Sequence, residues 1–166
     1  MTVKQVTRVA IMACIEFVIF GSFSDILYLE CITLTILLFG LAFDKKEALL
    51  ASIVFPIINM AMRQGVTPWS LMYLVIYPCY TVLIGLLRKP LLKHFWLSVL
   101  ICGFLSFLTG QLVQLPFLLV SKRITLIYLI VGLKTSLIQG AVSALACLLL
   151  FKPCYRVLKQ IERNEH

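Results

Sequence analysis

The chain has 166 residues, of which 61% are hydrophobic and 13% are charged, and its formal net charge is +8. A mean hydropathy of +1.03 indicates a chain solvated by lipid rather than by water, and the length leaves no room for an additional nucleotide-binding or soluble catalytic domain. The basic residues lie beside apolar segments, where retention at the cytoplasmic side of a membrane explains them, so a nucleic-acid partner is excluded.

Six apolar blocks follow one another along the chain, separated by short polar connections. They span residues 6–23, 26–43, 48–62, 69–87, 95–120 and 127–151. A bilayer core of about 30 Å needs about 20 apolar residues per helix, and lipid favours helices because they satisfy every backbone polar group internally. The pattern predicts an all-α integral membrane bundle of six transmembrane helices, forming a single membrane domain over residues 1–166.

The first block, 6–23, is interpreted as a retained membrane helix with one embedded carboxyl group, that of Glu16. Its early turns carry Ala10, Ala13 and Cys14, whose small side chains allow a second helix to approach closely. Internal packing is the favoured interpretation of these small residues. A docking face for another protein is the alternative.

The second and third blocks carry capping and bending signals. The block 26–43 follows Ser24 and Asp25, which could cap its first turn. The block 48–62 is short and holds Pro56, which frees a backbone carbonyl and often marks a bend in a membrane helix.

The fourth block, 69–87, follows a connection at 63–68 in which Gly and Pro indicate a turn. Trp69, Tyr73 and Tyr77 are spaced by four residues, so they share one helical face. Such a face offers flat apolar surface with hydroxyl and indole donors, which suits a small planar ligand. The alternative is an aromatic belt at the membrane interface, which Trp69 alone would satisfy, whereas Tyr77 lies too deep.

The fifth block, 95–120, is long and is expected to break near residues 111–116, where Pro116 lies. Serines inside the apolar blocks are expected to hydrogen-bond back to their own helices. These serines are Ser70, Ser98, Ser106, Ser136 and Ser143.

The last block, 127–151, is divided by Lys134, so residues 124–133 are expected to be partly loop or a short re-entrant segment. Pro153 is expected to end this helix at the cytoplasmic surface. The tail, residues 154–166, is amphipathic and is predicted to form a short surface helix.

The charge distribution orients the bundle. Placing both termini in the cytoplasm puts eleven basic residues inside: Lys4, Arg8, Lys45, Lys46, Arg88, Lys89, Lys93, Lys152, Arg156, Lys159 and Arg163. Four lie in outer segments: Arg63, Lys122, Arg123 and Lys134. This bias predicts cytoplasmic termini, in agreement with an even number of spans.

Polar residues gather in the outer halves of the predicted helices, whereas the inner halves are nearly all aliphatic. Polar groups in hydrocarbon are costly unless they are paired or face water, so these residues should surround a cavity open to the outside. The predicted substrate-binding residues are Glu30, Asn59, Arg63, Trp69, Tyr73, Tyr77, Gln111, Gln114, Lys134 and Gln139.

The sequence leaves the roles of two cationic side chains open. Lys134 needs a counter-charge or a water-filled site; Glu16 and Glu30 are the candidate partners, and the ligand is the alternative. Arg63 lies in the Gly/Pro connection, where it could gate the cavity or be a solvated loop charge.

No catalytic motif is found. His94 lies in the inner basic connection and His166 is terminal, so no embedded histidine is present for acid–base or metal chemistry. The sequence has no Walker A loop, no H-E-x-x-H and no G-x-S-x-G. Neither an enzymatic activity nor a cofactor or metal is expected.

Taken together, these features resemble the substrate-binding S component of an energy-coupling factor (ECF) vitamin transporter. The resemblance covers nearly the whole chain and rests on the six-helix size, the cytoplasmic termini, the small residues early in the first block and the Gly/Pro outer connection. The most family-like stretch is residues 65–73, Gly-Val-Thr-Pro-Trp-Ser-Leu-Met-Tyr.

The resemblance implies a division of labour. The S component captures a vitamin or precursor at the outer face with high affinity, while a transmembrane coupling protein and two ATPase subunits supply energy and the S component topples in the membrane. Small residues of the first helix, usually Ala-x-x-x-Ala, contact the coupling protein; here Ala10 and Cys14 have that spacing, with Ala13 beside them. The loops that close the pocket in this family correspond to residues 21–25, 63–68 and 121–124.

The residues leave the identity of the ligand open, and they leave three alternative functions open. A pyridoxine-like or hydroxymethylpyrimidine-like ligand suits the aromatic face, whereas pantothenate suits Arg63 and Lys134, which could hold its carboxylate. The expected location is multi-pass in a bacterial cell membrane. The alternative functions are a small-solute channel or a solitary secondary carrier, and, less favoured, a membrane-embedded enzyme; a channel would need a polar stripe through the full membrane depth.

Overall fold

The computed structural model describes residues 1–23, 26, 29–119 and 121–164, and this part of the chain is helical without any strand. The α-helices are α1 (Val3–Phe23), α2 (Ile32–Ala42), α3 (Lys45–Asn59), α4 (Pro68–Leu86), α5 (Arg88–Lys93), α6 (Phe95–Leu112) and α7 (Lys122–Asn164). A π-helical turn, η1 (Met60–Gln64), follows α3, and a 3-10 helix, η2 (Leu115–Leu119), follows α6. The all-α prediction is confirmed.

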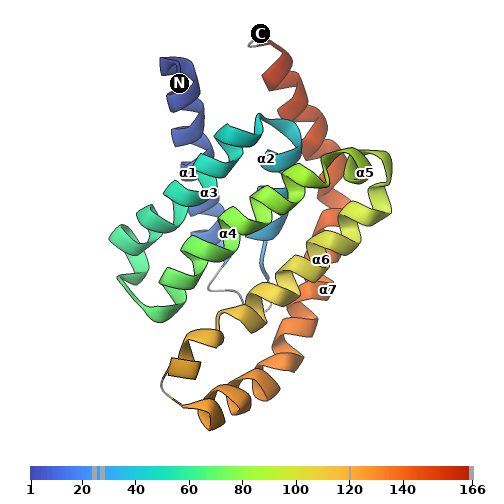
Figure 1. Ribbon diagram of the computed structural model, residues 1–166. Coiled ribbons are helices and arrows are strands. Elements are labelled where there is room, and N and C mark those ends of the chain that lie inside the picture. The colour runs from blue at the N-terminus through green and yellow to red at the C-terminus, as the bar shows by residue number, and fades with distance from the viewer. Residues whose placement is uncertain (24–25, 27–28, 120, 165–166) are drawn as a thin grey trace.

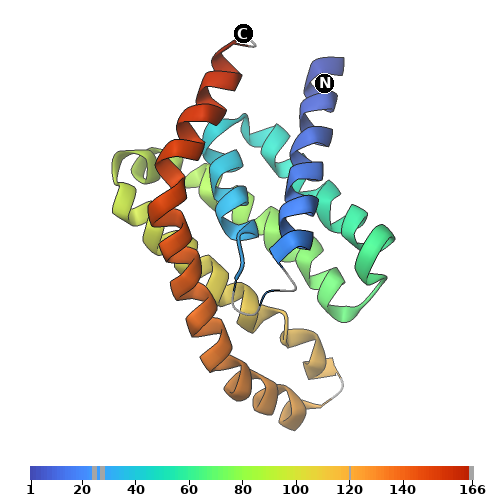
Figure 2. The same ribbon diagram turned by 180° about the vertical axis from the view of Figure 1, so that it is seen from behind.

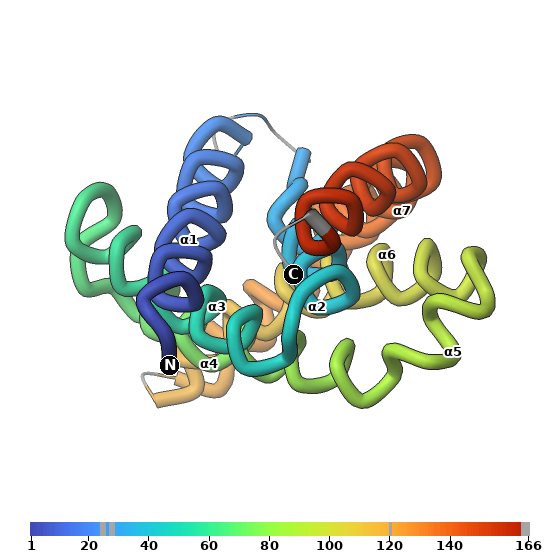
Figure 3. The backbone as a smooth tube through the Cα atoms, turned by 90° about the horizontal axis from the view of Figure 1, so that it is seen from above, coloured from blue at the N-terminus to red at the C-terminus, as the bar shows by residue number. Residues whose placement is uncertain are grey.

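The long helices run alternately down and up, so the two chain ends lie at the same end of the bundle (Figure 1). Helix α2 lies between α1 and α7, as the view from behind and the view from above both show (Figures 2 and 3). All residues of α2 are buried, and α6 packs along α7. Helix α2 therefore forms the centre of the bundle.

Local sequence signals explain where two helices begin. Asp44 caps α3, because its side chain accepts a hydrogen bond from the Lys46 backbone N–H at 3.3 Å. Thr67 caps α4 through a reciprocal capping box with Ser70, and Pro68 occupies the first helical turn. Gly65 has a φ of +65°, a conformation that glycine adopts without a steric penalty, and it turns the chain from η1 into α4.

Among the described residues, four helices are long and apolar enough to cross a membrane: Val3–Phe23, Pro68–Leu86, Phe95–Leu119 and Lys122–Arg163. Helix α2 has 11 residues, a length of only about 16 Å at 1.5 Å per residue. Helix α3, with 15 residues, is also shorter than a typical span. The structure thus provides four span-length helices rather than the six that the apolar blocks predict.

The predicted start of the second helix is wrong. Its N-cap is Cys31 rather than Ser24 or Asp25, both of which lie outside the described residues. The Leu29 backbone N–H instead donates to the Ile26 carbonyl in a turn, at 3.1 Å. The apolar stretch before α2 is therefore partly a connection.

The last apolar block also differs from the prediction. Helix α7 is continuous from Lys122 through residues 124–133 and past Pro153, so neither the re-entrant segment nor the helix end at Pro153 is found. Near the proline, the rings of Phe151 and Tyr155 stack along the helix at 5.7 Å between centroids. The described part of the tail is the last stretch of α7 rather than a separate surface helix. The predicted break near 111–116 is confirmed, because α6 ends at Leu112.

Much of the outside of the bundle is apolar. Exposed aliphatic side chains include Val18, Leu100 and Leu149, which are 60%, 68% and 72% accessible. Polar side chains, in contrast, lie inside, among them Glu16, Asn59 and Ser106, each at most 1% accessible. This reversal of the usual soluble-protein pattern is what a lipid surrounding favours, because exposed polar groups in hydrocarbon are costly.

Helices α6 and α7 approach closely through two glycines. A Cβ atom on Gly140 would lie 2.8 Å from the Gly103 carbonyl oxygen, and one on Gly103 would lie 2.9 Å from the Gly140 carbonyl oxygen. Glycine at both positions allows backbone to pack against backbone. The close approach brings the side chains of Ser106, on α6, and Ser143, on α7, within hydrogen-bonding distance of each other.

Candidate functional site

A cavity of about 320 Å³ lies among α1, α2, α4, α6 and α7. Its walls come from the last turns of α1, the residues just before α2, the first half of α4, the end of α6 and the first half of α7. Given the helix directions in Figure 1, all these segments lie toward the end of the bundle away from the chain termini. The polar lining residues are Glu30, Gln64, Tyr73, Tyr77, Thr109, Thr135 and Gln139.

Glu30 is the centre of a hydrogen-bond network in this cavity. The hydroxyl of Thr33 donates to carboxylate oxygen Oε1 at 2.9 Å, and the hydroxyl of Ser106 donates to Oε2 at 2.6 Å. The amide of Gln139 also donates to Oε2. Ser143 belongs to the same network, because its Oγ lies 2.8 Å from the Glu30 backbone carbonyl oxygen and 2.9 Å from Ser106 Oγ. Donors from α2, α6 and α7 thus converge on one carboxylate.

The other side of the cavity is aromatic. The rings of Tyr73 and Tyr77 are stacked, with centroids 5.3 Å apart and planes inclined by 13°. The ring of Phe20, from α1, meets that of Tyr73 edge-on at 5.4 Å. The predicted face of α4 is therefore present, and two of its three aromatic residues line the cavity. No described residue hydrogen-bonds the hydroxyl of Tyr73 or Tyr77, so both are available to a ligand.

Trp69 lies one step outside the main cavity. It is 43% accessible, and its ring packs edge-on against Phe117 at 5.6 Å. It lines a hollow of about 280 Å³ together with Gln64 and Tyr73, both of which also line the main cavity. Trp69 is thus placed at an extension of the site rather than at its centre.

A second hollow, of about 330 Å³, adjoins the cavity between α6 and α7 and shares Thr135 and Gln139 with it. Gln114 lines this hollow. Gln111 donates through its amide to Ser136 Oγ at 2.8 Å, so it connects the two helices. Of the predicted amides, only Gln139 reaches the main cavity.

Asn59 and Arg63 act next to the cavity rather than in its lining. Asn59 is fully buried, and its amide donates to Gln64 Oε1 at 2.9 Å, which positions a lining residue. Arg63 donates to the Gly21 carbonyl oxygen at 2.6 Å and thereby links η1 to the end of α1. The Arg63 side chain therefore joins two of the segments predicted to close the pocket.

Lys134 lies away from the cavity. Its side chain is exposed and is absent from the cavity linings. Neither Glu16 nor Glu30 forms an ion pair with it in the part of the chain described. The geometry of α7 explains this, because Ser136 bonds to Gln111 of α6, and Lys134 lies two residues before Ser136, about 200° away around the helix.

Glu16 is buried in α1 and does not line the cavity. Small residues of the same helix point in different directions. Ala13 is fully buried, whereas Ala10 and Cys14 are exposed. The predicted docking face therefore loses Ala13, which packs inside the bundle, and retains Ala10 and Cys14 on the outer surface.

Sequence reasoning missed the serines of the site. Ser106 and Ser143 were expected to bond to their own helices, but they link α6 and α7 by bonding to each other and to Glu30, which lies in the connection before α2. One available signal was the run of small residues at helical spacing, such as Gly103 with Ser106 and Gly140 with Ser143. Such a stripe predicts close helix packing, which brings hydroxyls into reach of a neighbouring helix.

Comparison with protein-family models, curated proteins and solved structures yields no match. The described residues contain no group of three or more His, Cys, Asp and Glu side chains that could hold a metal ion. The arrangement that is present, a hydrogen-bonded carboxylate facing stacked tyrosines, is suited to binding a small molecule.

Proposed function

We propose that this chain is the substrate-capture subunit of an ATP-driven importer of a vitamin or vitamin precursor, similar to the S components of ECF transporters. It captures a small molecule outside the cell with high affinity. A transmembrane coupling protein and two ATPase subunits supply the energy. The chain is multi-pass in a bacterial cell membrane, with six membrane crossings and both termini in the cytoplasm.

The single observation that carries this proposal is the cavity around Glu30. It combines a positioned carboxylate with the stacked rings of Tyr73 and Tyr77, and it has the size of a pocket for a small ligand. It lies in one half of the bundle, as expected of a subunit that captures from one side of the membrane.

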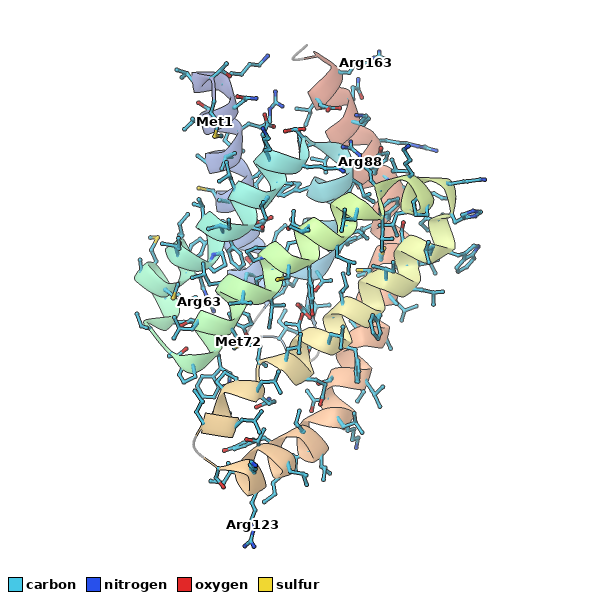
Figure 4. All side chains as sticks on the ribbon, viewed as in Figure 1. Met1, Arg63, Met72, Arg88, Arg123 and Arg163 are labelled. Atoms are coloured by element: carbon cyan, nitrogen blue, oxygen red, sulfur yellow. The ribbon has the colours of Figure 1, made fainter. Side chains whose placement is uncertain are left out.

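The charge distribution supports the proposed orientation. Met1, Arg88 and Arg163 lie at one end of the bundle and Arg123 lies at the opposite end (Figure 4). The end with the chain termini carries most of the basic residues, which is typical of a cytoplasmic side. The alternating helices of Figure 1 are consistent with six crossings if the short helices α2 and α3 cross within the bundle, shielded from lipid by their neighbours.

A channel is less well supported. A pore needs polar side chains along its whole length, but α2, at the centre of the bundle, is apolar from Ile36 to Ala42 and fully buried there. The cavity therefore ends against packed aliphatic side chains. A subunit that binds on one side and relies on partners for release fits this arrangement better.

The test combines retention of a ligand with energy dependence. The chain purified from membranes should retain a small molecule in native mass spectrometry. Uptake of that molecule into cells should require co-expression of a coupling protein with its two ATPases, and an ATPase-inactive version of the same module provides the matched control. Uptake by the chain alone at an equal rate would overturn the proposal in favour of a solitary carrier or channel.

The orientation can be tested separately in a background in which the six native cysteines are replaced. Arg123→Cys should react with a membrane-impermeant thiol reagent added to intact cells, whereas Thr2→Cys should react only after the membrane is opened. The reverse pattern would contradict the proposed topology.

A further inference from the structure

We propose that the molecule captured in the cavity is a single-ring nitrogen heterocycle that presents an amino group or a protonated ring nitrogen to Glu30. This inference rests on the proposed function, because it assumes that the cavity is the capture site. It assigns the chemical class of the ligand and decides between the two classes that the sequence left open.

The first argument is the set of groups around the carboxylate. Thr33, Ser106 and Gln139 all lie within hydrogen-bonding distance of the Glu30 carboxyl group and can donate to it. Two of the three donors share Oε2, so Oε1 receives only the hydroxyl of Thr33. A carboxylate oxygen has two lone-pair directions, and within the described residues the second one on Oε1 has no donor.

The second argument is charge. No described Lys, Arg or His side chain forms an ion pair with Glu30, and the residues lining the cavity include no cation. A carboxyl group whose partners in the protein are all neutral favours a ligand that brings a positive charge or strongly polarised N–H groups. A ligand carboxylate would instead be repelled by Glu30.

The third argument is the aromatic wall. Tyr73, Tyr77 and Phe20 present rings to the same cavity. Aromatic faces attract planar rings, and they attract cations through the ring quadrupole. A cavity of about 320 Å³ is at the small end for ligand pockets, which favours one ring rather than a fused or extended molecule.

These arguments favour a hydroxymethylpyrimidine-like or pyridoxine-like ligand over pantothenate. The pantothenate hypothesis needed Arg63 and Lys134 to hold a carboxylate. Lys134 is exposed, and the Arg63 side chain is not part of the cavity lining. Neither cation is therefore placed to neutralise an acid in the cavity.

The decisive experiment compares ligands on the unmodified chain. Calorimetry in detergent would use 4-amino-5-hydroxymethyl-2-methylpyrimidine, its 4-oxo analogue, pyridoxine and pantothenate. The 4-amino compound or pyridoxine should bind, and the 4-amino compound should bind at least tenfold more tightly than its 4-oxo analogue, whose carbonyl oxygen opposes a carboxylate. Pantothenate binding as tight as that of the two heterocycles, or no binding of either heterocycle, would overturn the inference.

Single-residue variants test whether the preference for the 4-amino compound depends on Glu30. Glu30→Gln should abolish the preference for the 4-amino compound over its 4-oxo analogue, while Lys134→Gln, an exposed charge change of the same size, should preserve it. Thr33→Val tests the same site without altering the charge and should weaken binding less than Glu30→Gln does. A Glu30→Gln variant that retains the full preference would refute the assignment.

The identity of any retained molecule separates this inference from the proposed function. A retained carboxylic acid whose uptake needs the ATPases would overturn the heterocycle assignment and leave the capture function intact. A retained nitrogen heterocycle whose uptake does not need the ATPases would support the ligand class and refute the coupling to ATP hydrolysis.

Discussion

Replacing Gly140 by alanine tests whether the close contact between α6 and α7 holds the site together. The new Cβ atom would lie 2.8 Å from the Gly103 carbonyl oxygen and 3.1 Å from Phe107 Cβ, and the first of these neighbours is backbone that cannot rotate away. Overpacking of this kind costs about 1–3 kcal/mol, whereas the helix propensity of alanine returns about 1 kcal/mol. We therefore expect a net loss of up to about 2 kcal/mol in the free energy of unfolding.

Gly132→Ala is the matched control for this change, because it adds the same methyl group to the same helix. The nearest atoms to its Cβ lie 3.9 and 4.0 Å away, on the side chains of Gln114 and Gln111. This variant should keep or raise the melting temperature. A change of 1 kcal/mol shifts the melting temperature of a chain of this size by about 2–4 °C.

The assay is thermal unfolding of both variants in the same detergent, followed by ligand binding at low temperature. Gly140→Ala should melt below the unmodified chain and bind more weakly, because separating α6 from α7 moves Ser106 and Gln139 away from Glu30. A Gly140→Ala variant that melts as high as Gly132→Ala would show that the two backbones are not in contact, and the reasoning would fail.

Four further predictions concern single side chains. Tyr73→Ala should weaken ligand binding by about 1–3 kcal/mol in calorimetry, while Tyr155→Ala, which removes a stacked ring on Phe151 far from the cavity, should leave affinity unchanged. Lys134→Gln should change neither affinity nor melting temperature, because the side chain is exposed; a clear loss of affinity would return Lys134 to the site. Glu47→Gln should lower stability by about 3 kcal/mol, seen as a lower melting temperature, because it breaks the buried ion pair with Arg8 at 2.9 Å; unchanged stability would contradict this. Ala10→Leu should preserve ligand binding and melting temperature but impair ATP-dependent uptake, and normal uptake would remove this face of α1 as the docking surface.

The helical periodicity of the sequence predicted those features that depend on residues within a single helix. The spacing of Tyr73 and Tyr77 placed both rings on one face, and their stacking at 5.3 Å confirms it. Pro116 correctly indicated where α6 ends. These features could be read from the sequence because they depend on residues a few positions apart.

What the sequence could not provide is the pairing between distant segments. The residue number of Gln139 exceeds that of Glu30 by 109, and no local pattern brings them together. Lys134 is a second example. A lysine in an apolar stretch predicts a buried partner, but the direction of its side chain depends on which face of α7 packs against α6, and the local sequence does not give that face. The apolar blocks likewise predicted helix where Glu30 is instead held in a connection by side chains from α2, α6 and α7.

If the chain is the proposed capture subunit, the placement of the cavity constrains how a captured molecule could reach the other side of the membrane. Beyond the site, the core includes Leu37, Leu41 and Ile84, each fully buried, so a direct path would require parting aliphatic packing along the centre of the bundle. Opening such a core costs several kcal/mol for each large side chain that loses its neighbours. A movement of the whole bundle keeps this packing intact and changes only the lipid-facing contacts, which are apolar around α1, α6 and α7. Under the proposed function, delivery by reorientation of the whole bundle would therefore be physically easier than a pathway through the chain itself, and this is a further reason to prefer that proposal to a channel.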